Sequence, residues 1–272
     1  MTAAPAILAD EAGVKTIIES YATLTDRCEF EALEKLYADE LKLDYSSLSG
    51  DPAAVIKPEI LMTSWARLLP GFDRTRHNLS DLSASVDGDE AVATANVRAG
   101  YWLGQDYWET QGRYRFELTR QAKGWKITAM TFTLENEIGS RDMFTGAALA
   151  AAAAPPSYLQ RRETRQTVLD FLTGLEEKDV QKINDCWAEN AMQDAPYTPE
   201  DWPALVSIKG FTDHLAFYPM IDPQAIYVEF KNAAASSADS PARQPYGGVF
   251  HVENGKITRY REYFDPREFA RA

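Results

Sequence analysis

Cysteine and histidine are scarce in this sequence of 272 residues, which has two cysteines and three histidines. Cys28 and Cys186 do not form a CxxC pair, so the sequence favours two free thiols over a disulfide framework or a zinc site. Three dispersed histidines make a poor set of metal ligands. The sequence also contains no GxGxxG, Walker or HExxH pattern. These absences together predict chemistry that needs neither a metal nor another cofactor.

Basic residues and long apolar runs are also lacking. Lysine and arginine together number 28 against 41 acidic residues, which gives a formal net charge of −13. This balance disfavours nucleic acid and anionic membranes as partners, because both require basic surfaces. No apolar run approaches the roughly 20 residues that span a bilayer, and the first residues lack the basic region of a signal peptide. We therefore expect a cytoplasmic protein that acts on a small-molecule substrate.

The length suits two domains of about 130 residues each. The stretch 147–156 is the one low-complexity segment, with a run of alanines that ends in Pro155 and Pro156. Alanine favours a helix and proline stops it, so this stretch reads as a short spacer. The sequence thus predicts a first domain at 1–146, a linker at 147–156 and a second domain at 157–272.

The two halves resemble each other at nearly fixed offsets. Tyr37 and Asp44 match Trp187 and Asp194 at an offset of 150, whereas Lys126 and Lys256 match at an offset of 130. The second copy has therefore lost 20 residues (150 − 130) between these anchors. The loss is about the length of one long strand plus a turn. We expect it between the strands predicted at 225–233 and 246–252.

Periodicity and turn residues predict the same order of elements in both halves. The first half has helices at 14–25, 30–37 and 58–69, a short strand at 41–45, and long strands at 74–86, 91–103, 107–120 and 125–135. The second has helices at 161–175, 180–187 and 210–218, and strands at 225–233, 246–252 and 256–264. This order predicts an α+β fold of two tandem domains, each a curled antiparallel sheet packed on helices, with the second domain shortened.

His77 and Asp26 are candidates for proton transfer. An imidazole can accept a proton near pH 7, but a lone histidine is more often structural. Asp26 could orient an imidazole and stabilise its charged form. It could equally be the N-cap of the second helix, since Asp26-Arg27-Cys28-Glu29 fits a capping box.

Further candidates surround this pair. Tyr45 could donate its hydroxyl to a substrate oxygen, or only bury its ring. Trp65, Tyr101 and Phe132 are candidates for an aromatic lining, and Arg113 for binding substrate oxygens. Period-two alternation does not say which strand face lines a pocket.

Three segments of the first half carry a resemblance to a known family. These are Leu24–Leu33 followed by Leu43-Asp44-Tyr45, then Arg74-Thr75-Arg76-His77, and finally Gly124-Trp125-Lys126-Ile127. Together they resemble the SnoaL-like, NTF2-like superfamily, and most closely its scytalone dehydratase branch. The resemblance implies a cystatin-like cone with an inward-facing dyad of Asp26 and His77, and Tyr45 as the tyrosine that activates the substrate. The second histidine of the dehydratase is missing from 108–113.

The second half resembles the same superfamily through 246–257 and Tyr263-Phe264-Asp265-Pro266. At the offset of 150, Asp26 becomes Glu176 and Tyr45 becomes Ala195. The dyad histidine has no clear counterpart near 225–228, and we place His214 on the third helix and His251 on another strand. We expect a degenerate copy that pairs with the first domain in place of a dimer partner, while a homo-oligomer stays open.

These observations favour a cofactor-independent lyase of the dehydratase type, acting on a small aromatic or polyketide-like hydroxy or carbonyl compound. Aldol-type carbon–carbon cleavage with release of formaldehyde, or isomerisation, needs the same dyad. A non-catalytic ligand- or protein-binding module is the alternative of another class. The enzyme hypothesis requires heavy atoms of the Asp26 and His77 side chains to lie about 2.6–3.2 Å apart inside a cavity. The binding-module hypothesis allows the two side chains to lie apart.

Overall fold

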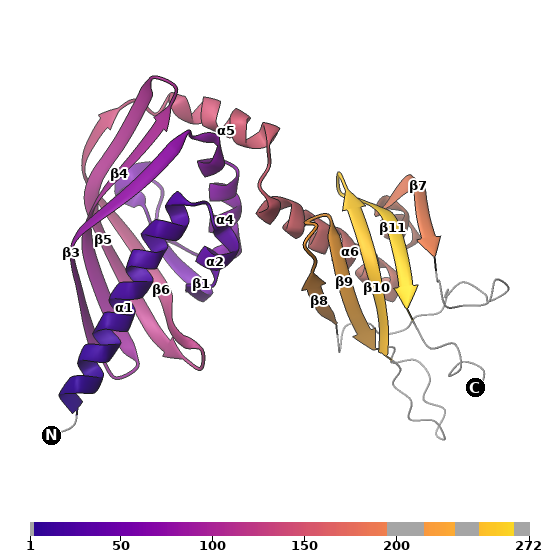
Figure 1. Ribbon diagram of the computed structural model, residues 1–272, viewed down its shortest axis with the longest axis horizontal. Helices are drawn as coiled ribbons and strands as arrows, with labels where there is room; N and C mark the ends of the chain where they lie inside the picture. The colour runs from indigo at the N-terminus through magenta and orange to yellow at the C-terminus, as the bar shows by residue number, and fades with distance from the viewer. Residues whose placement is uncertain (1–2, 195–214, 232–244, 264–272) are drawn as a thin grey trace. The chain divides into compact units, whose positions relative to one another are not determined.

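The computed structural model describes residues 3–194, 215–231 and 245–263. The chain divides into two compact units, Met1–Pro156 and Ser157–Ala272. Both combine helices with one curled sheet, so the predicted α+β class is correct (Figure 1).

The helices of unit 1 come mainly before its long strands. Their bounds are α1 Ala3–Asp26, α2 Phe30–Glu34, α3 Ser46–Ser49, α4 Pro58–Ala66, the 3-10 turn η1 Leu69–Gly71, and α5 Met143–Ala153. Pro58 occupies the first turn of α4 as predicted, where its missing N–H would have no partner in any case. Helix α2 ends before Tyr37, although we expected that residue on the helix. Tyr37 instead begins the first strand, where it pairs with Ile127.

Six strands form the sheet of unit 1. They are β1 Tyr37–Asp44, β2 Ala54–Ile56, β3 Arg74–Asp87, β4 Glu90–Leu103, β5 Asp106–Gln121 and β6 Gly124–Gly139, in the order β2-β1-β6-β5-β4-β3. All pairs are antiparallel except β1 with β6, which is parallel. The long strands agree with the four predicted runs to within a few residues, because their alternating pattern extends over their whole length.

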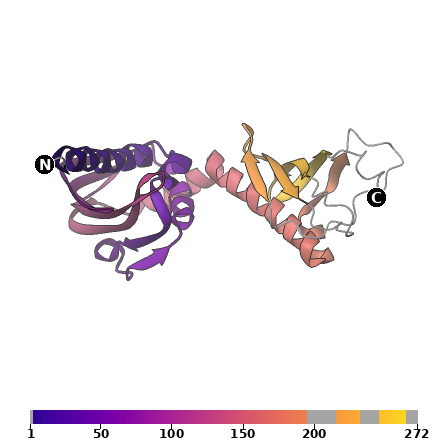
Figure 2. The same cartoon turned by 90° about the horizontal axis from the view of Figure 1, so that it is seen from below.

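Alternation gives the sheet one buried and one exposed face. On β5, Tyr114, Phe116 and Leu118 are buried, whereas Arg113, Arg115 and Glu117, which alternate with them, are exposed. Helix α1 lies along β3 and covers the buried face on that side (Figures 1 and 2). Its own buried stripe includes Val14, Ile18 and Tyr21, which repeat at helical spacing. The end of α1 therefore lies beside the beginning of β3.

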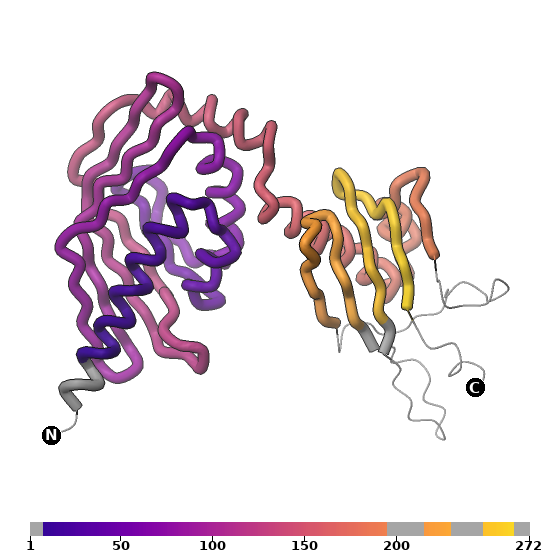
Figure 3. The backbone as a smooth tube through the Cα atoms, in the orientation of Figure 1, coloured from indigo at the N-terminus to yellow at the C-terminus, as the bar shows by residue number. Residues whose placement is uncertain are grey.

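Unit 2 has the same layers with shorter strands. Helices α6 Ser157–Glu177 and α7 Val180–Asp185 precede β7 Trp187–Asp194, β8 Ala216–Pro219, β9 Ala225–Lys231, β10 Pro245–Glu253 and β11 Lys256–Tyr263. The sheet order is β7-β11-β10-β9-β8, and α6 lies across one face of this sheet (Figures 2 and 3). Val168, Phe171 and Leu172 of α6 form a core with Phe250 and Tyr260 of the sheet.

The strand registers of the two units coincide at the predicted offsets. In unit 1, Tyr37 pairs with Ile127 and Asp44 with Thr131. In unit 2, Trp187 pairs with Ile257 and Asp194 with Arg261. Adding 150 to the residues of β1 and 130 to those of β6 converts each pair of the first set into the second. Lysines at equivalent positions also donate to equivalent backbone carbonyls, Lys126 to Lys35 and Lys256 to Asp185.

The place of the missing residues was predicted wrongly. Paired strands make Ser80 of β3 equivalent to Ala216 of β8, through Asn96 and Glu229. From Asp44 to Ser80 is 36 positions, but from Asp194 to Ala216 is 22. Most of the 20-residue loss therefore precedes β8. The interval between β9 and β10 is not shortened at all.

Two other expectations for the second half fail for the same reason. Residues 216–219 form strand β8 and not the end of a helix, while 210–214 lie outside the described residues. The strand at 225–231 pairs as the counterpart of β4 and not of β3. A counterpart of His77 should therefore be sought near position 213, outside the described part of the chain.

The alanine-rich stretch is mostly helical. Residues up to Ala153 belong to α5, in which Ala147 and Ala151 are buried. Gly71 of η1 lies against Ala147, since a Cβ at Gly71 would meet the carbonyl oxygen of Ala147 at 1.7 Å. This part of the predicted linker packs on unit 1. The limits of the two functional domains remain a prediction.

Candidate functional site

The candidate site begins with His77 on β3. In this strand Thr75 and His77 are buried, whereas Arg74, Arg76 and Asn78 are exposed. Strand alternation therefore turns the imidazole into unit 1, and only 3% of its side chain is exposed. The reading of His77 as a surface histidine does not fit this burial.

Asp26 meets His77 from the last position of α1. Its Oδ1 lies 2.6 Å from Nδ1 of His77, and its Oδ2 accepts the backbone N–H of His77 at 2.8 Å. Thr75 donates its hydroxyl to Oδ1 at 3.1 Å. Asp26 does not cap α2, because the N-cap of that helix is Glu29 and no side chain caps it. The capping-box interpretation is therefore wrong, and the carboxylate is committed to β3.

These hydrogen bonds fix the charge and the tautomer. Burial alone would raise the pKa of Asp26, but hydrogen bonds from His77 and Thr75 outweigh burial and lower it. Asp26 is thus a carboxylate at neutral pH and can only accept. Nδ1 of His77 must then carry a proton, and in the neutral form of the imidazole the lone pair lies on Nε2. Such an arrangement makes Nε2 the atom that can take a proton from another molecule.

Tyr101 on β4 faces this free nitrogen. Its hydroxyl lies 3.3 Å from Nε2 of His77, and the two rings meet edge to face at a centroid distance of 5.8 Å. Across the sheet, His77 pairs with Ala99 and Ala99 with Thr110. Thr110 is buried in this row, on the strand where the dehydratase pattern would have its second histidine. The Tyr101 hydroxyl therefore lies within hydrogen-bonding distance of the reactive nitrogen.

Tyr45 is placed by a local turn at the end of β1. Asp44 Oδ1 accepts both the backbone N–H and the hydroxyl of Ser46, which starts α3. The hydroxyl of Ser47 then donates to the carbonyl of Phe132 on β6. These contacts hold Tyr45 against Phe132, with ring centroids 5.8 Å apart. Tyr45 itself is half-buried.

Two further tyrosines belong to the site and were not predicted to do so. Tyr21 of α1 is fully buried, and its hydroxyl donates to the hydroxyl of Tyr114 on β5 at 3.4 Å. Burial raises the pKa of Tyr45, while the hydroxyls of Tyr21 and Tyr114 act on it in the opposite sense. The available signal was that hydroxyl-bearing residues lay on strictly buried stripes of a helix and a strand.

The predicted lining residues divide between the two faces of the sheet. The ring of Trp65 on α4 lies against that of Tyr21, with ring centroids 6.3 Å apart. The rings of Phe132 and Tyr114 are in contact, with centroids 5.2 Å apart. Arg113, by contrast, is exposed and donates to the Thr94 hydroxyl at 3.3 Å. Its neighbour Tyr114 points inward, so alternation turns Arg113 outward. The prediction that Arg113 binds substrate within this site is wrong.

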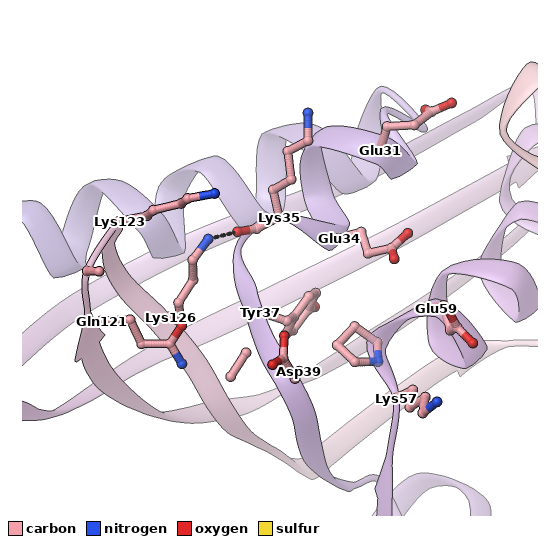
Figure 4. A pocket seen from close by; sticks show the side chains of 13 residues that line it. Glu31, Glu34, Lys35, Tyr37, Asp39, Lys57, Glu59, Gln121, Lys123 and Lys126 are labelled. Atoms are coloured by element: carbon pink, nitrogen blue, oxygen red, sulfur yellow. Dashed lines mark hydrogen bonds between the residues drawn. The ribbon is translucent and has the colours of Figure 1, made fainter. Parts of the chain in front are cut away.

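A separate groove of about 830 Å³ lies on unit 1 beside β1 and α2 (Figure 4). It is lined by Glu31, Glu34, Lys35, Tyr37, Ala38, Asp39, Lys57, Pro58, Glu59, Gln121, Ala122, Lys123 and Lys126. The amine of Lys126 donates a hydrogen bond to the backbone carbonyl of Lys35. The lining holds charges of both signs but neither member of the dyad. We assign the candidate site to the dyad, where a base and its orienting group are in contact.

The described part of unit 2 does not repeat this arrangement. Glu176, the counterpart of Asp26, is exposed on α6. Ala195 and His214 lie outside the described residues. His251 is equivalent by register to Glu117, on the exposed face of the first sheet. Within the described residues of the whole chain, no group of three or more His, Cys, Asp or Glu side chains could hold a metal ion, and no helix could cross a membrane.

Comparison with known proteins finds a family model that is similar to most of unit 1. Residues 6–131 match the model of the SnoaL-like domain. The uncharacterized protein YesE of Bacillus subtilis is 28% identical over 119 residues, which cover 37% of this chain and 80% of YesE.

Two solved structures are also similar. The Kfla4162 protein of Kribbella flavida is 24% identical, with a TM-score of 0.45, over 55% of this chain and 99% of its own. An NTF2-like protein with a cystatin-like fold from Novosphingobium aromaticivorans is 20% identical, with a TM-score of 0.41, over 54% and 92%. The match of residues 6–131 to the SnoaL-like domain agrees with the resemblance predicted from the sequence of the first half.

Proposed function

We propose that unit 1 is a cofactor-independent lyase, a dehydratase in which His77 transfers the proton. One observation carries this proposal: Nδ1 of His77 lies 2.6 Å from Oδ1 of Asp26, within the range expected of a working dyad. A plain binding module would not require this contact. The similarity of residues 6–131 to the SnoaL-like domain supports the proposal.

In the proposed reaction, Nε2 of His77 removes a proton from the carbon next to a carbonyl group of the substrate. The electron pair of that C–H bond moves through an enolate to form a carbon–carbon double bond. The hydroxyl on the following carbon leaves with its bonding pair and takes a proton from the imidazolium, which gives water. Asp26 offsets the positive charge that His77 carries between the two transfers.

The remaining side chains position the substrate. Tyr45 donates a hydrogen bond to the carbonyl oxygen, on which negative charge develops. The Tyr101 hydroxyl forms a hydrogen bond with Nε2 of His77, and the substrate displaces this hydroxyl when it binds. Trp65 and Phe132 supply apolar surface for a small aromatic or polyketide-like ring. Carbon–carbon cleavage or isomerisation would use the same proton transfer on a different substrate.

The test incubates the full chain with a panel of aromatic and polyketide-like β-hydroxy carbonyl compounds. Mass spectrometry then detects products that have lost one water molecule. His77→Gln should lower the rate on a converted compound about 10²- to 10⁴-fold, as expected for removal of a general base. Arg113→Ala is the matched control and should leave the rate unchanged, because its side chain is on the exposed face. Turnover that survives in His77→Gln would sink the assignment.

A further inference from the structure

Glu137 and Arg141 form an ion pair where β6 ends in unit 1. Glu137 lies in the last turn of residues on β6, and Arg141 follows in the connection between β6 and α5. Nε of Arg141 donates to Oε1 of Glu137 at 2.6 Å, and Nη2 donates to Oε2 at 2.8 Å. Two parallel hydrogen bonds of this kind fix the relative orientation of both groups. We call Glu137 and Arg141 the rim pair.

The carboxylate of the rim pair lies on the same face of the sheet as the dyad. Glu137 pairs with Thr110, and Thr110 pairs with Ala99. Ala99 in turn pairs with His77. Residues that are directly opposite on antiparallel strands point to the same face. Glu137 and His77 are therefore the two ends of one row, with only two small side chains between them.

Glu137 also holds a group of aromatic rings beside the dyad. Its Oε1 accepts the indole N–H of buried Trp108 at 2.6 Å. The indole contacts the ring of Tyr101 at a centroid distance of 5.0 Å and that of Phe144 at 4.8 Å. We call these three rings the aromatic wall. The Tyr101 hydroxyl lies 3.3 Å from Nε2 of His77, so a path of contacts runs from Glu137 to this nitrogen.

Arg141 contacts the segment that carries Tyr45. Its Nη1 donates to the backbone carbonyl of Leu48 at 3.1 Å. Leu48 belongs to α3, the short helix that begins directly after Tyr45. Hydrogen bonds from Arg141 and Trp108 lower the pKa of Glu137, so the rim pair is charged at neutral pH. Exposed ion pairs contribute little to stability by themselves, so the contacts of this pair matter more than its attraction.

We infer that Glu137 and Arg141 are positioning residues of the unit 1 site. Glu137 fixes the aromatic wall beside Nε2 of His77, and Arg141 fixes α3 beside Tyr45. The ion pair between them sets the spacing of these two parts of the site, and neither residue touches the reacting atoms. This assignment rests on the proposed function, because it takes His77 as the base.

The first measurement is an NMR spectrum of the full chain with isotope-labelled histidine rings. The chain has three histidines, so the signal of His77 is identified by its loss in His77→Gln. The Tyr101 ring meets His77 edge to face at a centroid distance of 5.8 Å, so a displaced wall changes the ring current at the imidazole. Glu137→Ala should therefore shift the His77 signal. Glu137→Gln keeps an oxygen for the indole N–H and should shift it less.

Glu117→Ala is the matched control. Glu117 on β5 forms an ion pair with Arg115 at 3.0 Å, but both side chains lie on the exposed face of the sheet. Its removal takes away the same charge and should leave the His77 signal in place. Thermal melting checks that each variant is folded. Arg141→Ala releases Glu137 without removing its charge, should also shift the signal, and keeps the test informative if Glu137→Ala does not fold.

The second measurement is kinetic and uses a compound that the wild type converts. Glu137→Ala and Arg141→Ala should each lower kcat about tenfold, because small displacements of reacting groups are costly. KM should change less, since neither side chain contacts the substrate. Glu137→Gln should recover part of the lost rate, and Glu117→Ala should keep all of it.

An unmoved His77 signal in both Glu137→Ala and Arg141→Ala would overturn the inference. An equal shift in Glu117→Ala, or a shifted signal with unchanged kcat, would do the same. If the signal responds to the rim pair but turnover ignores His77, the lyase is rejected and the positioning of the imidazole stands. If turnover requires His77 but neither the signal nor kcat responds, the lyase stands and the rim pair is an ordinary ion pair.

Discussion

The imidazole of His77 and the carboxylate of Asp26 are joined twice, through Nδ1 at 2.6 Å and through the backbone N–H of His77 at 2.8 Å, although the residues are 51 positions apart. The side-chain bond orients the ring, and the backbone bond ties the end of α1 to β3. A single carboxylate thus serves both the proposed chemistry and the packing of unit 1.

Asp26→Asn should destabilise the protein more at pH 6 than at pH 3. The pKa of Asp26 is lowered from 3.8, so its charge stabilises the folded state above 3.8, and this contribution is lost as the pH falls through the lower folded value. The difference between the two pH values should be about 1–3 kcal/mol, as for a hydrogen-bonded charge. Urea unfolding of both proteins measures it. Exposed Asp39→Asn corrects for net charge, and an equal cost of Asp26→Asn at both pH values would contradict the prediction.

Glu262→Gln should stabilise unit 2 at alkaline pH. This carboxyl on β11 is 4% exposed, its Oε1 has no hydrogen-bond partner among the described residues, and burial raises its pKa from 4.5 to about 7. Because the folded pKa is raised, stability is greatest below 4.5 and is lost as the pH rises through about 7. The shift amounts to about 3 kcal/mol.

Urea unfolding at pH 5 and pH 8 tests this, with the variant gaining stability mainly at pH 8. Glu253→Gln is the control, since it removes the same charge from an exposed position on the adjacent strand β10. A gain that is equal at the two pH values would show that ionisation of Glu262 is not its cause.

Gly71→Ala should loosen the contact between η1 and α5. The added Cβ would lie 1.7 Å from the carbonyl oxygen of Ala147 and 2.9 Å from the backbone nitrogen of Ala151. Backbone atoms must then shift, at a cost of about 1–3 kcal/mol. Gly13→Ala is the opposite case, because its Cβ would meet nothing within 4 Å on α1. It should gain about 0.5–1 kcal/mol. Thermal melting of both variants decides, and an unchanged melting temperature for Gly71→Ala would refute the tight contact.

The sequence by itself determined the class of fold and the repeated order of elements. Long alternating strands and amphipathic helices show their hydrophobic periodicity within a single stretch of sequence. It also predicted that β7 and β11 pair in the same register as β1 and β6. The offsets of 150 and 130 convert each residue pair of β1 and β6 into a pair of β7 and β11. It failed for Tyr37 and β8, where strand pairing overrides local preference over a few residues.

Only the tertiary structure decided what the polar side chains do. Asp26-Arg27-Cys28-Glu29 fits a helix cap in sequence, and nothing local shows that the carboxylate turns to β3 instead. Arg113 and Tyr114 are neighbours that alternation sends to opposite faces, and the choice of face depends on where α1 packs. Tyr21 and Tyr114 meet because a helix and a strand converge, a relationship between distant residues that no local pattern records.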